Sequence, residues 1–276
     1  MIPPFVEASF LAEHPHVVLV DVRWYLDGRD GHAAYEAGHL PGAVWIDLDH
    51  DLAADGAPAA AGRHPFPTPE AFAAAMSAAG IGDDSIVVAY DDTGGLTAGR
   101  LVVMLRMLGC NAAVLDGGLL GWTGTLQIGT GAAPQSATFT AKQWPPERLA
   151  TADETAEHGR SGGVLLDARA RERFTGEVTI ADPRPGHIPG ASCASWAAVL
   201  ADGRLRDADD LRAYYESLGV HDGSETIAYC GSGVSACMNV LAMEHAGLAA
   251  PRLFVASWSG WSSDESRAAE LGDPRE

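Results

Sequence analysis

The sequence predicts an α/β protein made of two tandem domains, each a mainly parallel sheet flanked by helices on both faces. Short apolar runs such as Val17–Val20 and Ile86–Ala89 alternate with longer segments of helical periodicity. Strands that are apolar throughout are typical of parallel sheets covered by helices on both sides. The length of 276 residues suits two domains of ~100–200 residues each.

Four landmarks occur twice in the same order. An apolar run ends in Asp, a His-Leu/Ile-Pro-Gly-Ala turn follows, a second apolar run ends in Tyr, and a Gly-Trp pair closes the half. The landmarks are Asp21, His39, Tyr90 and Trp122 in the first half and Asp167, His187, Tyr229 and Trp261 in the second. The Asp–His separations are 18 and 20 residues, and both Tyr–Trp separations are 32. This spacing indicates a duplicated domain.

The domain boundaries follow from composition. Residues 129–146 contain a stretch rich in Gly, Pro, Ser and Thr that is uncharged up to Lys142, so we predict a linker there. The first domain is then 1–128 and the second 147–276. Helices are expected over 97–108 and 235–246, each ended by a glycine.

The charge balance restricts the partners. With Lys+Arg at 18 and Asp+Glu at 37, the formal net charge is −19. Such a surface repels phosphate backbones and anionic lipid, so neither nucleic acid nor a membrane is an expected partner. An anionic substrate would need locally placed arginines. The first residues lack a basic segment and a long apolar stretch, so we expect a cytoplasmic protein rather than a secreted one.

One of the four cysteines lies in a loop suited to nucleophilic chemistry. The stretch from Tyr229 to Ala236 reads strand end, Cys230, Gly231-Ser232-Gly233-Val234-Ser235, helix. Glycines let the backbone N–H groups converge on one point, and the helix N-terminus adds positive potential, so the loop favours a thiolate. The matching loop of the first half has Asp91 in place of the cysteine. We therefore predict that the first domain is catalytically silent.

The other cysteines and the paired histidines suggest no metal site. Cys110, Cys193 and Cys237 have neither zinc-ligand spacing nor a glycine-rich loop, and are expected to pack as small apolar groups. His39 and His187 occupy equivalent turns of different domains, so we interpret them as structural. We expect neither a metal nor an organic cofactor.

Nearly the whole chain resembles the two-domain rhodanese-type sulfurtransferases. The resemblance rests on the two His-Leu/Ile-Pro-Gly-Ala turns, the two Gly-Trp pairs and the Cys230–Ala236 loop. The loop Cys-Gly-Ser-Gly-Val-Ser-Ala is similar to that of 3-mercaptopyruvate sulfurtransferases. Thiosulfate-specific members usually carry basic residues directly after the cysteine, where this chain has Gly231 and Ser232.

The resemblance implies roles for individual residues. Cys230 would be the nucleophile, and Ser232, His64 and Asp49 would form a proton relay. Arg173 and Arg184 would bind the carboxylate and carbonyl of mercaptopyruvate, since a guanidinium can donate two parallel hydrogen bonds. The loop residues expected at the substrate are Gly231, Gly233, Val234 and Ser235.

The implied reaction moves a sulfane sulfur from a small anionic donor to Cys230 as a persulfide. The sulfur then passes to a thiol acceptor such as thioredoxin, or to cyanide. Two alternatives stay open: a thiosulfate:cyanide sulfurtransferase with the same nucleophile, and a non-catalytic rhodanese-like regulatory module. A cysteine phosphatase is disfavoured, because its Cys-x5-Arg loop needs an arginine where this chain has Ala236.

Overall fold

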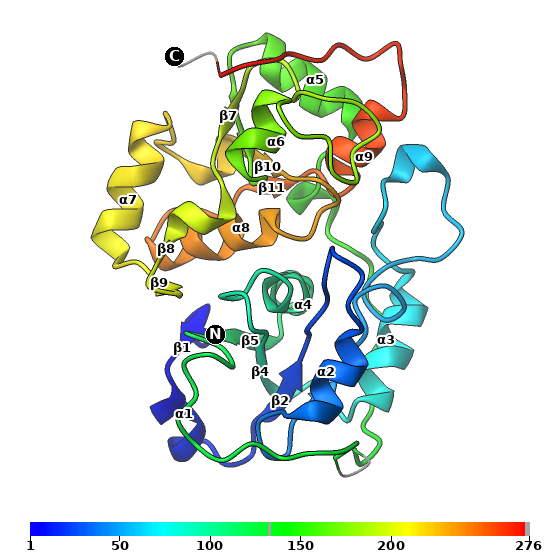
Figure 1. The fold of residues 1–276 in the computed structure, drawn as a ribbon, viewed down its shortest axis with the longest axis vertical. Coiled ribbons are helices and arrows are strands. Elements are labelled where there is room, and N and C mark those ends of the chain that lie inside the picture. Colours follow the sequence, from blue (N-terminus) through cyan, green and yellow to red (C-terminus); the bar gives the residue numbers. More distant parts are fainter. Residues whose placement is uncertain (132–133, 274–276) are drawn as a thin grey trace. The chain divides into compact units, whose positions relative to one another are not determined.

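The computed structural model describes residues 1–131 and 134–273, which form two compact units (Figure 1). The first unit contains the described residues of Met1–Asp55, Phe66–Trp144 and Asp202–Leu205. The second contains Gly56–Pro65, Pro145–Ala201 and the described residues from Arg206 onward. Each unit therefore includes a short segment from the other half of the sequence.

The first unit is built on a five-stranded parallel sheet of order β1-β5-β4-β2-β3. Its strands are β1 (Phe5–Val6), β2 (Val18–Asp21), β3 (Val44–Trp45), β4 (Ile86–Tyr90) and β5 (Asn111–Leu115). In the register of β2 and β4, Asp21 pairs with Tyr90, so both landmarks lie at the carboxyl edge of the sheet.

The second unit repeats this plan with a four-stranded parallel sheet of order β11-β10-β6-β7. Its strands are β6 (Val164–Asp167), β7 (Ala191–Cys193), β10 (Thr226–Tyr229) and β11 (Arg252–Leu253). A parallel bridge from Leu149 to Leu253 takes the place of β1. The short strand β8 (Leu200–Ala201) follows β7, and the next short strand along the chain, β9 (Arg204–Leu205), belongs to the first unit.

Helices accompany both sheets. In the first half they are α1 (Ala8–Glu13), α2 (Gly31–Ala37), η1 (Ala59–Ala61), α3 (Pro69–Ala78) and α4 (Ala98–Met107). In the second half they are η2 (Pro146–Arg148), α5 (Ala152–Arg160), α6 (Arg171–Thr175), η3 (Trp196–Val199), α7 (Ala208–Ser217), η4 (Gly223–Glu225), α8 (Ala236–His245) and α9 (Ser257–Ser262). The α/β fold and both predicted helices, 97–108 and 235–246, are thus confirmed. No described helix is long and apolar enough to span a bilayer.

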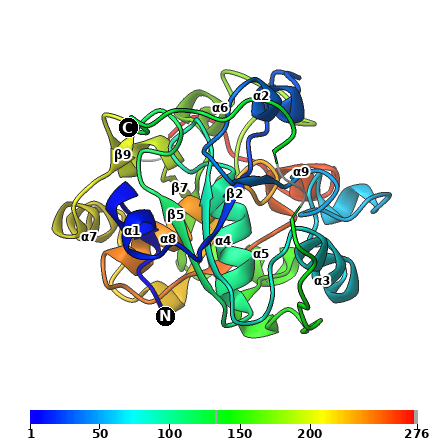
Figure 2. The same cartoon turned by 90° about the horizontal axis from the view of Figure 1, so that it is seen from below.

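Local sequence signals explain where several helices begin. Thr68 caps α3 by accepting the Ala71 N–H, with Pro69 in the first turn. Thr151 and Glu154 form a reciprocal capping box at α5. α4 is almost wholly buried and packs on β4 and β5, which Figures 1 and 2 show from two directions.

A buried ion pair recurs at the carboxyl edge of each sheet. Asp21 binds Arg23, whose Nη2 also donates to the Gly38 carbonyl at 2.8 Å. In the second unit Asp167 binds Arg169, which donates to the Gly186 carbonyl, also at 2.8 Å. In each unit the ion pair thus connects the end of one strand (β2 or β6) to the turn that precedes the next strand (β3 or β7).

The predicted linker 129–146 includes residues 132 and 133, which lie outside the described residues. Its later part packs on the first unit. Phe139 and Trp144 contact the Phe72 ring of α3, and the Trp144 indole donates to the Pro67 carbonyl at 2.8 Å.

Candidate active site

Cys230 lies directly after β10, at the carboxyl edge of the second unit's sheet. Its side chain is buried, and the Gly233 N–H donates to its Sγ at 3.1 Å. The Cys230 N–H donates to Ser257 Oγ at 3.1 Å, and the Trp258 N–H donates to the Cys230 carbonyl at 2.9 Å. The start of α9 therefore holds the backbone that carries the sulfur.

A left-handed residue turns the loop back toward the sulfur. Gly233 has φ +76°, which favours glycine because other residues are strained there. Val234 is buried, Ser235 is the N-cap residue of α8, and the helix begins at Ala236. The loop residues expected at the substrate thus form one turn around Cys230, with the positive end of a buried helix behind it.

The matching loop of the first unit encloses a carboxylate. Asp91 is buried and accepts the N–H groups of Thr93, Gly95, Thr97 and Ala98 at 2.8 to 3.0 Å. The Thr97 hydroxyl donates to it as well, at 3.0 Å. Four convergent N–H groups form an anion nest, and the protein's own side chain fills it. In the first unit the nest is therefore occupied by a carboxylate of the chain itself.

Two guanidinium groups stand beside Gly231. A Cβ built on Gly231 would lie 2.9 Å from Nη2 of Arg173 and 3.4 Å from Nη2 of Arg63. Glycine at this position lets both groups come this close to the loop without displacement. Desolvation lowers the pKa of Arg63, and repulsion from Arg173 adds to this, whereas Asp182 and Cys230 oppose it.

Arg173 is held by a buried carboxylate. Its Nε and Nη2 donate to Asp182 at 2.9 and 2.6 Å. The Asp182 side chain is 1% exposed, and Arg169 lies 3.4 Å away on its other side. Arg63 donates through Nη1 to the carbonyl of Ala181, the residue before Asp182.

Arg184 has different partners from Arg173. Its Nη2 donates to the carbonyls of Asp264 and Arg267 at 3.3 and 2.5 Å. Its own carbonyl accepts the Trp258 indole N–H at 3.0 Å. In this structure Arg184 therefore binds the segment that follows α9.

His64 and Ser232 are in direct contact. His64 Nδ1 lies 2.8 Å from Ser232 Oγ, and both side chains are nearly inaccessible to solvent. Asp49 belongs to the first unit, where its carboxylate accepts the Trp24 indole N–H at 2.8 Å.

His64 reaches Ser232 because residues 56–65 belong to the second unit. The Arg63 N–H donates to Ser259 Oγ at 3.1 Å, and Gly62 lies against the backbone of Ala256. A Cβ on Gly260 would lie 2.7 Å from the Ala60 carbonyl oxygen. Glycines on both sides thus allow η1 to contact α9 closely.

Sequence reasoning missed Arg63 and Asp182. One feature of the sequence could have pointed to Arg63 as a site residue: it directly precedes His64, a candidate catalytic histidine. Asp182 had none, because an acidic residue in a Pro-rich loop is normally solvated.

The remaining cysteines and histidines are in structural environments. Burial raises the pKa of Cys193 to about 11, and burial also raises the pKa of Cys110. His39 and His187 are fully buried, and each donates through Nδ1 to a carbonyl at 2.9 Å. Burial lowers the pKa of His187 and so favours its neutral form.

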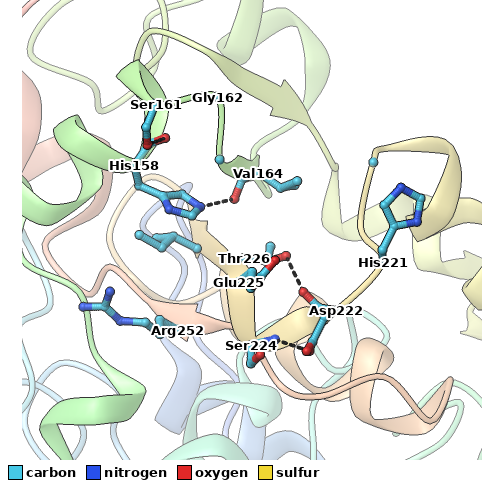
Figure 3. A pocket seen from close by; sticks show the side chains of 13 residues that line it. His158, Ser161, Gly162, Val164, His221, Asp222, Ser224, Glu225, Thr226 and Arg252 are labelled. Atoms are coloured by element: carbon cyan, nitrogen blue, oxygen red, sulfur yellow. Dashed lines mark hydrogen bonds between the residues drawn. The ribbon is translucent and has the colours of Figure 1, made fainter.

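A cavity of about 510 Å³ lies at the other edge of the second unit's sheet, near the first residues of β6 and β10 (Figure 3). His158 lines it, with Nε2 3.3 Å from the Val164 carbonyl, and Asp222 accepts the Ser224 N–H. This cavity opens at the amino ends of the strands, whereas Cys230 follows a carboxyl end. Ligands of open α/β sheets bind at the carboxyl ends.

Comparison with known proteins identifies the family of this chain. The rhodanese-like domain model matches residues 7–125 and 151–264. The chain is 39% identical to the probable 3-mercaptopyruvate sulfurtransferase of Pseudomonas aeruginosa, with 96% of each chain covered. It is 41% identical to the putative thiosulfate sulfurtransferase SseB of Mycobacterium tuberculosis, covering 93% of this chain and 91% of the relative. The crystal structure of the 3-mercaptopyruvate sulfotransferase SseA from Escherichia coli superposes with a TM-score of 0.81 at 32% identity, covering 93% of this chain and 99% of that one. The chain belongs to the rhodanese-like domain family.

Proposed function

We propose that this protein is a sulfurtransferase that takes a sulfur atom from 3-mercaptopyruvate and carries it as a persulfide on Cys230. The observation that carries the proposal is the pair of guanidinium groups, Arg173 and Arg63, packed against Gly231 beside the nucleophile. They provide local positive charge on a protein whose formal net charge is −19.

The donor carboxylate is assigned to Arg173 and Arg63. A guanidinium binds a planar carboxylate through parallel hydrogen bonds, which are among the stronger ones in proteins. Arg184, expected from the sequence to share this role, has its Nη2 on two main-chain carbonyls. We therefore assign it to holding the segment after α9 rather than to the donor.

In the first step the Cys230 thiolate attacks the sulfur of mercaptopyruvate. A sulfur–sulfur bond forms, the carbon–sulfur bond breaks, and its electron pair leaves on carbon as the enolate of pyruvate. The Gly233 N–H, 3.1 Å from Sγ, stabilises negative charge on the thiolate before attack. The other N–H groups of the loop, from Gly231, Val234 and Ser235, are assigned to the outer sulfur of the persulfide.

The enolate needs a proton to become pyruvate. Ser232 lies two residues after the nucleophile, and the contact with His64 connects its hydroxyl to an imidazole. Imidazole exchanges protons near neutral pH, which a serine hydroxyl alone does not. We assign delivery of the proton to Ser232 with His64. Asp49, which the resemblance adds to this relay, accepts the Trp24 indole N–H in the first unit.

In the second step an acceptor thiolate, from a protein such as thioredoxin, or cyanide attacks the outer sulfur and releases the Cys230 thiolate. This is the chemistry of thiol–disulfide exchange, in which a thiolate attacks sulfur. It requires Cys230 in the reduced state, and we place the reaction in the cytoplasm, which keeps thiols reduced.

Thiosulfate is the second candidate donor. The 41% identity to a relative named as a putative thiosulfate sulfurtransferase supports it, and two guanidinium groups could receive a dianion. Against it, Gly231 and Ser232 supply no cationic side chain directly after the cysteine. We therefore expect the higher kcat/KM with mercaptopyruvate.

A cyanide-release assay with each donor tests the proposal. Thiocyanate formed at the higher kcat/KM from mercaptopyruvate is expected. A clear preference for thiosulfate would replace the proposed donor by the alternative, and no turnover with either donor would favour a regulatory module.

A further inference from the structure

We propose that Asp182 is a positioning residue that also sets donor specificity, by limiting the positive charge beside Cys230 and so disfavouring a donor with two negative charges. The inference rests on the proposed function and extends it to a residue outside the predicted relay and loop. Asp182 is a buried carboxylate among guanidinium groups that we assign to an anionic donor.

Asp182 fixes the orientation of Arg173. A guanidinium has five N–H groups, and Asp182 takes Nε and one hydrogen of Nη2. The nitrogen atoms nearest to Gly231 are Nη2 and Nη1, at 2.9 and 3.6 Å from a built Cβ. The ion pair therefore leaves the outer edge of the guanidinium directed at the loop that carries Cys230.

Burial makes this orientation strong. The Asp182 side chain is 1% exposed and that of Arg173 is 15% exposed. Ion pairs shielded from water are screened little by salt, and removing one partner leaves an uncompensated buried charge. Arg173 is thus held before any donor arrives, which lowers the entropy lost on binding.

Asp182 also limits the positive charge next to Cys230. Arg169 has Asp167 as its bidentate partner, at 2.7 Å through Nη2. The two guanidinium groups at Gly231, the carboxylate of Asp182 and the Cys230 thiolate carry no net formal charge together. Bound mercaptopyruvate, with its single carboxylate, then leaves one uncompensated negative charge at the site, whereas thiosulfate leaves two.

The first unit shows that the strand-end ion pair does not require this second carboxylate. Arg23 repeats the contacts of Arg169 to an aspartate and to a glycine carbonyl. Among residues 1–131 and 134–273, Asp21 is the one acidic residue that forms an ion pair with Arg23. The additional carboxylate is present where the nucleophile is, which favours a role in donor binding over one in the shared framework.

The test is the ratio of kcat/KM for thiosulfate to kcat/KM for mercaptopyruvate. Asp182→Asn removes one negative charge from the site and should raise this ratio by ~10-fold or more. It should also raise KM for mercaptopyruvate, because Arg173 is no longer held. Asp182→Glu keeps the charge and should keep the ratio within ~3-fold.

Glu157→Gln is the matched control. It changes the protein's net charge by the same amount, but at an exposed carboxylate paired with Arg160. The ratio should stay that of the unaltered protein. An Asp182→Asn ratio equal to that of the control would show that Asp182 has only a structural role and would overturn the inference.

A second variant covers the case in which Asp182→Asn does not fold. Arg63→Gln removes one positive charge and should lower the ratio by ~10-fold. An unchanged ratio in this variant would equally overturn the charge argument.

Binding of inert anions separates this inference from the proposed function. Calorimetry with inorganic sulfate and with pyruvate needs no turnover. Asp182→Asn should tighten sulfate binding relative to pyruvate binding by ~10-fold. If the unaltered protein turns over neither donor but this shift appears, the charge argument stands and the sulfurtransferase proposal fails. If turnover occurs and neither ratio shifts, the sulfurtransferase proposal stands and the charge argument fails.

Discussion

His64 Nδ1 lies 2.8 Å from Ser232 Oγ, although 168 positions separate the two residues in the chain. The contact exists because residues 56–65, from the first half of the sequence, belong to the same compact unit as Cys230. A unit whose nucleophile comes from one half of a duplicated chain thus takes its histidine from the other half. The first half therefore supplies a candidate catalytic group even though its own loop holds Asp91.

Cys230→Ser should abolish sulfur transfer from either donor, because a serine hydroxyl cannot store sulfane sulfur. The protein incubated with donor should gain one sulfur atom, located on Cys230 by peptide mass spectrometry. Cys193 is the internal control. Its pKa of about 11 keeps it a thiol at neutral pH, so it should stay unmodified. Sulfur found on Cys193 in place of Cys230 would refute the assignment.

His64→Ala should slow mercaptopyruvate turnover by ~10-fold or more, since the leaving enolate then lacks a proton source. Sulfite leaves thiosulfate as a stable anion and needs no proton, so thiosulfate turnover should fall much less. Steady-state kinetics with both donors measure the difference. Equal losses with both donors would point to a structural role for the contact with Ser232.

Arg173→Ala should lower kcat/KM for mercaptopyruvate by ~10–100-fold, because one charge-assisted contact contributes ~1.5–3 kcal/mol. Arg184→Ala serves as the comparison. It removes hydrogen bonds to two main-chain carbonyls and should lower the melting temperature, with a smaller effect on KM. If Arg184→Ala raised KM more than Arg173→Ala, the sequence-based assignment of Arg184 to the donor would be restored.

Gly62→Ala should lower mercaptopyruvate turnover by ~10-fold by displacing the segment that carries His64. A Cβ there would overlap the backbone of Ala256, and Gly62 has φ +83°. Gly56→Ala is the matched control, with φ +67° and no atom within 4 Å of the added Cβ. It introduces similar backbone strain without the overlap, so its turnover should be nearly unchanged. Similar losses in both variants would attribute the effect to strain alone.

Much of the fold and part of the site could be predicted from the order of residues along the chain. Apolar runs, turn glycines and helix caps act within a few residues of one another, so the repeated strands, α4, α8 and the Cys230 loop were recognisable locally. The substitution of Asp91 for the nucleophile was visible for the same reason. The resemblance added His64 and Ser232, which no local pattern connects.

The tertiary structure alone decided which charged groups surround Cys230. Arg63, Asp182 and Arg184 all lie in polar loops, and such loops look solvated in a sequence. Burial and ion pairing depend on contacts between distant segments. Asp182 is buried between Arg169 and Arg173. Arg63 reaches Gly231 because η1 packs on α9, and Arg184 is bound by the segment after α9. The loop sequence therefore identified the nucleophile, but packing sets the charge of its surroundings. The strength of an electrostatic contact depends on separation in space and on exclusion of water, not on spacing along the chain.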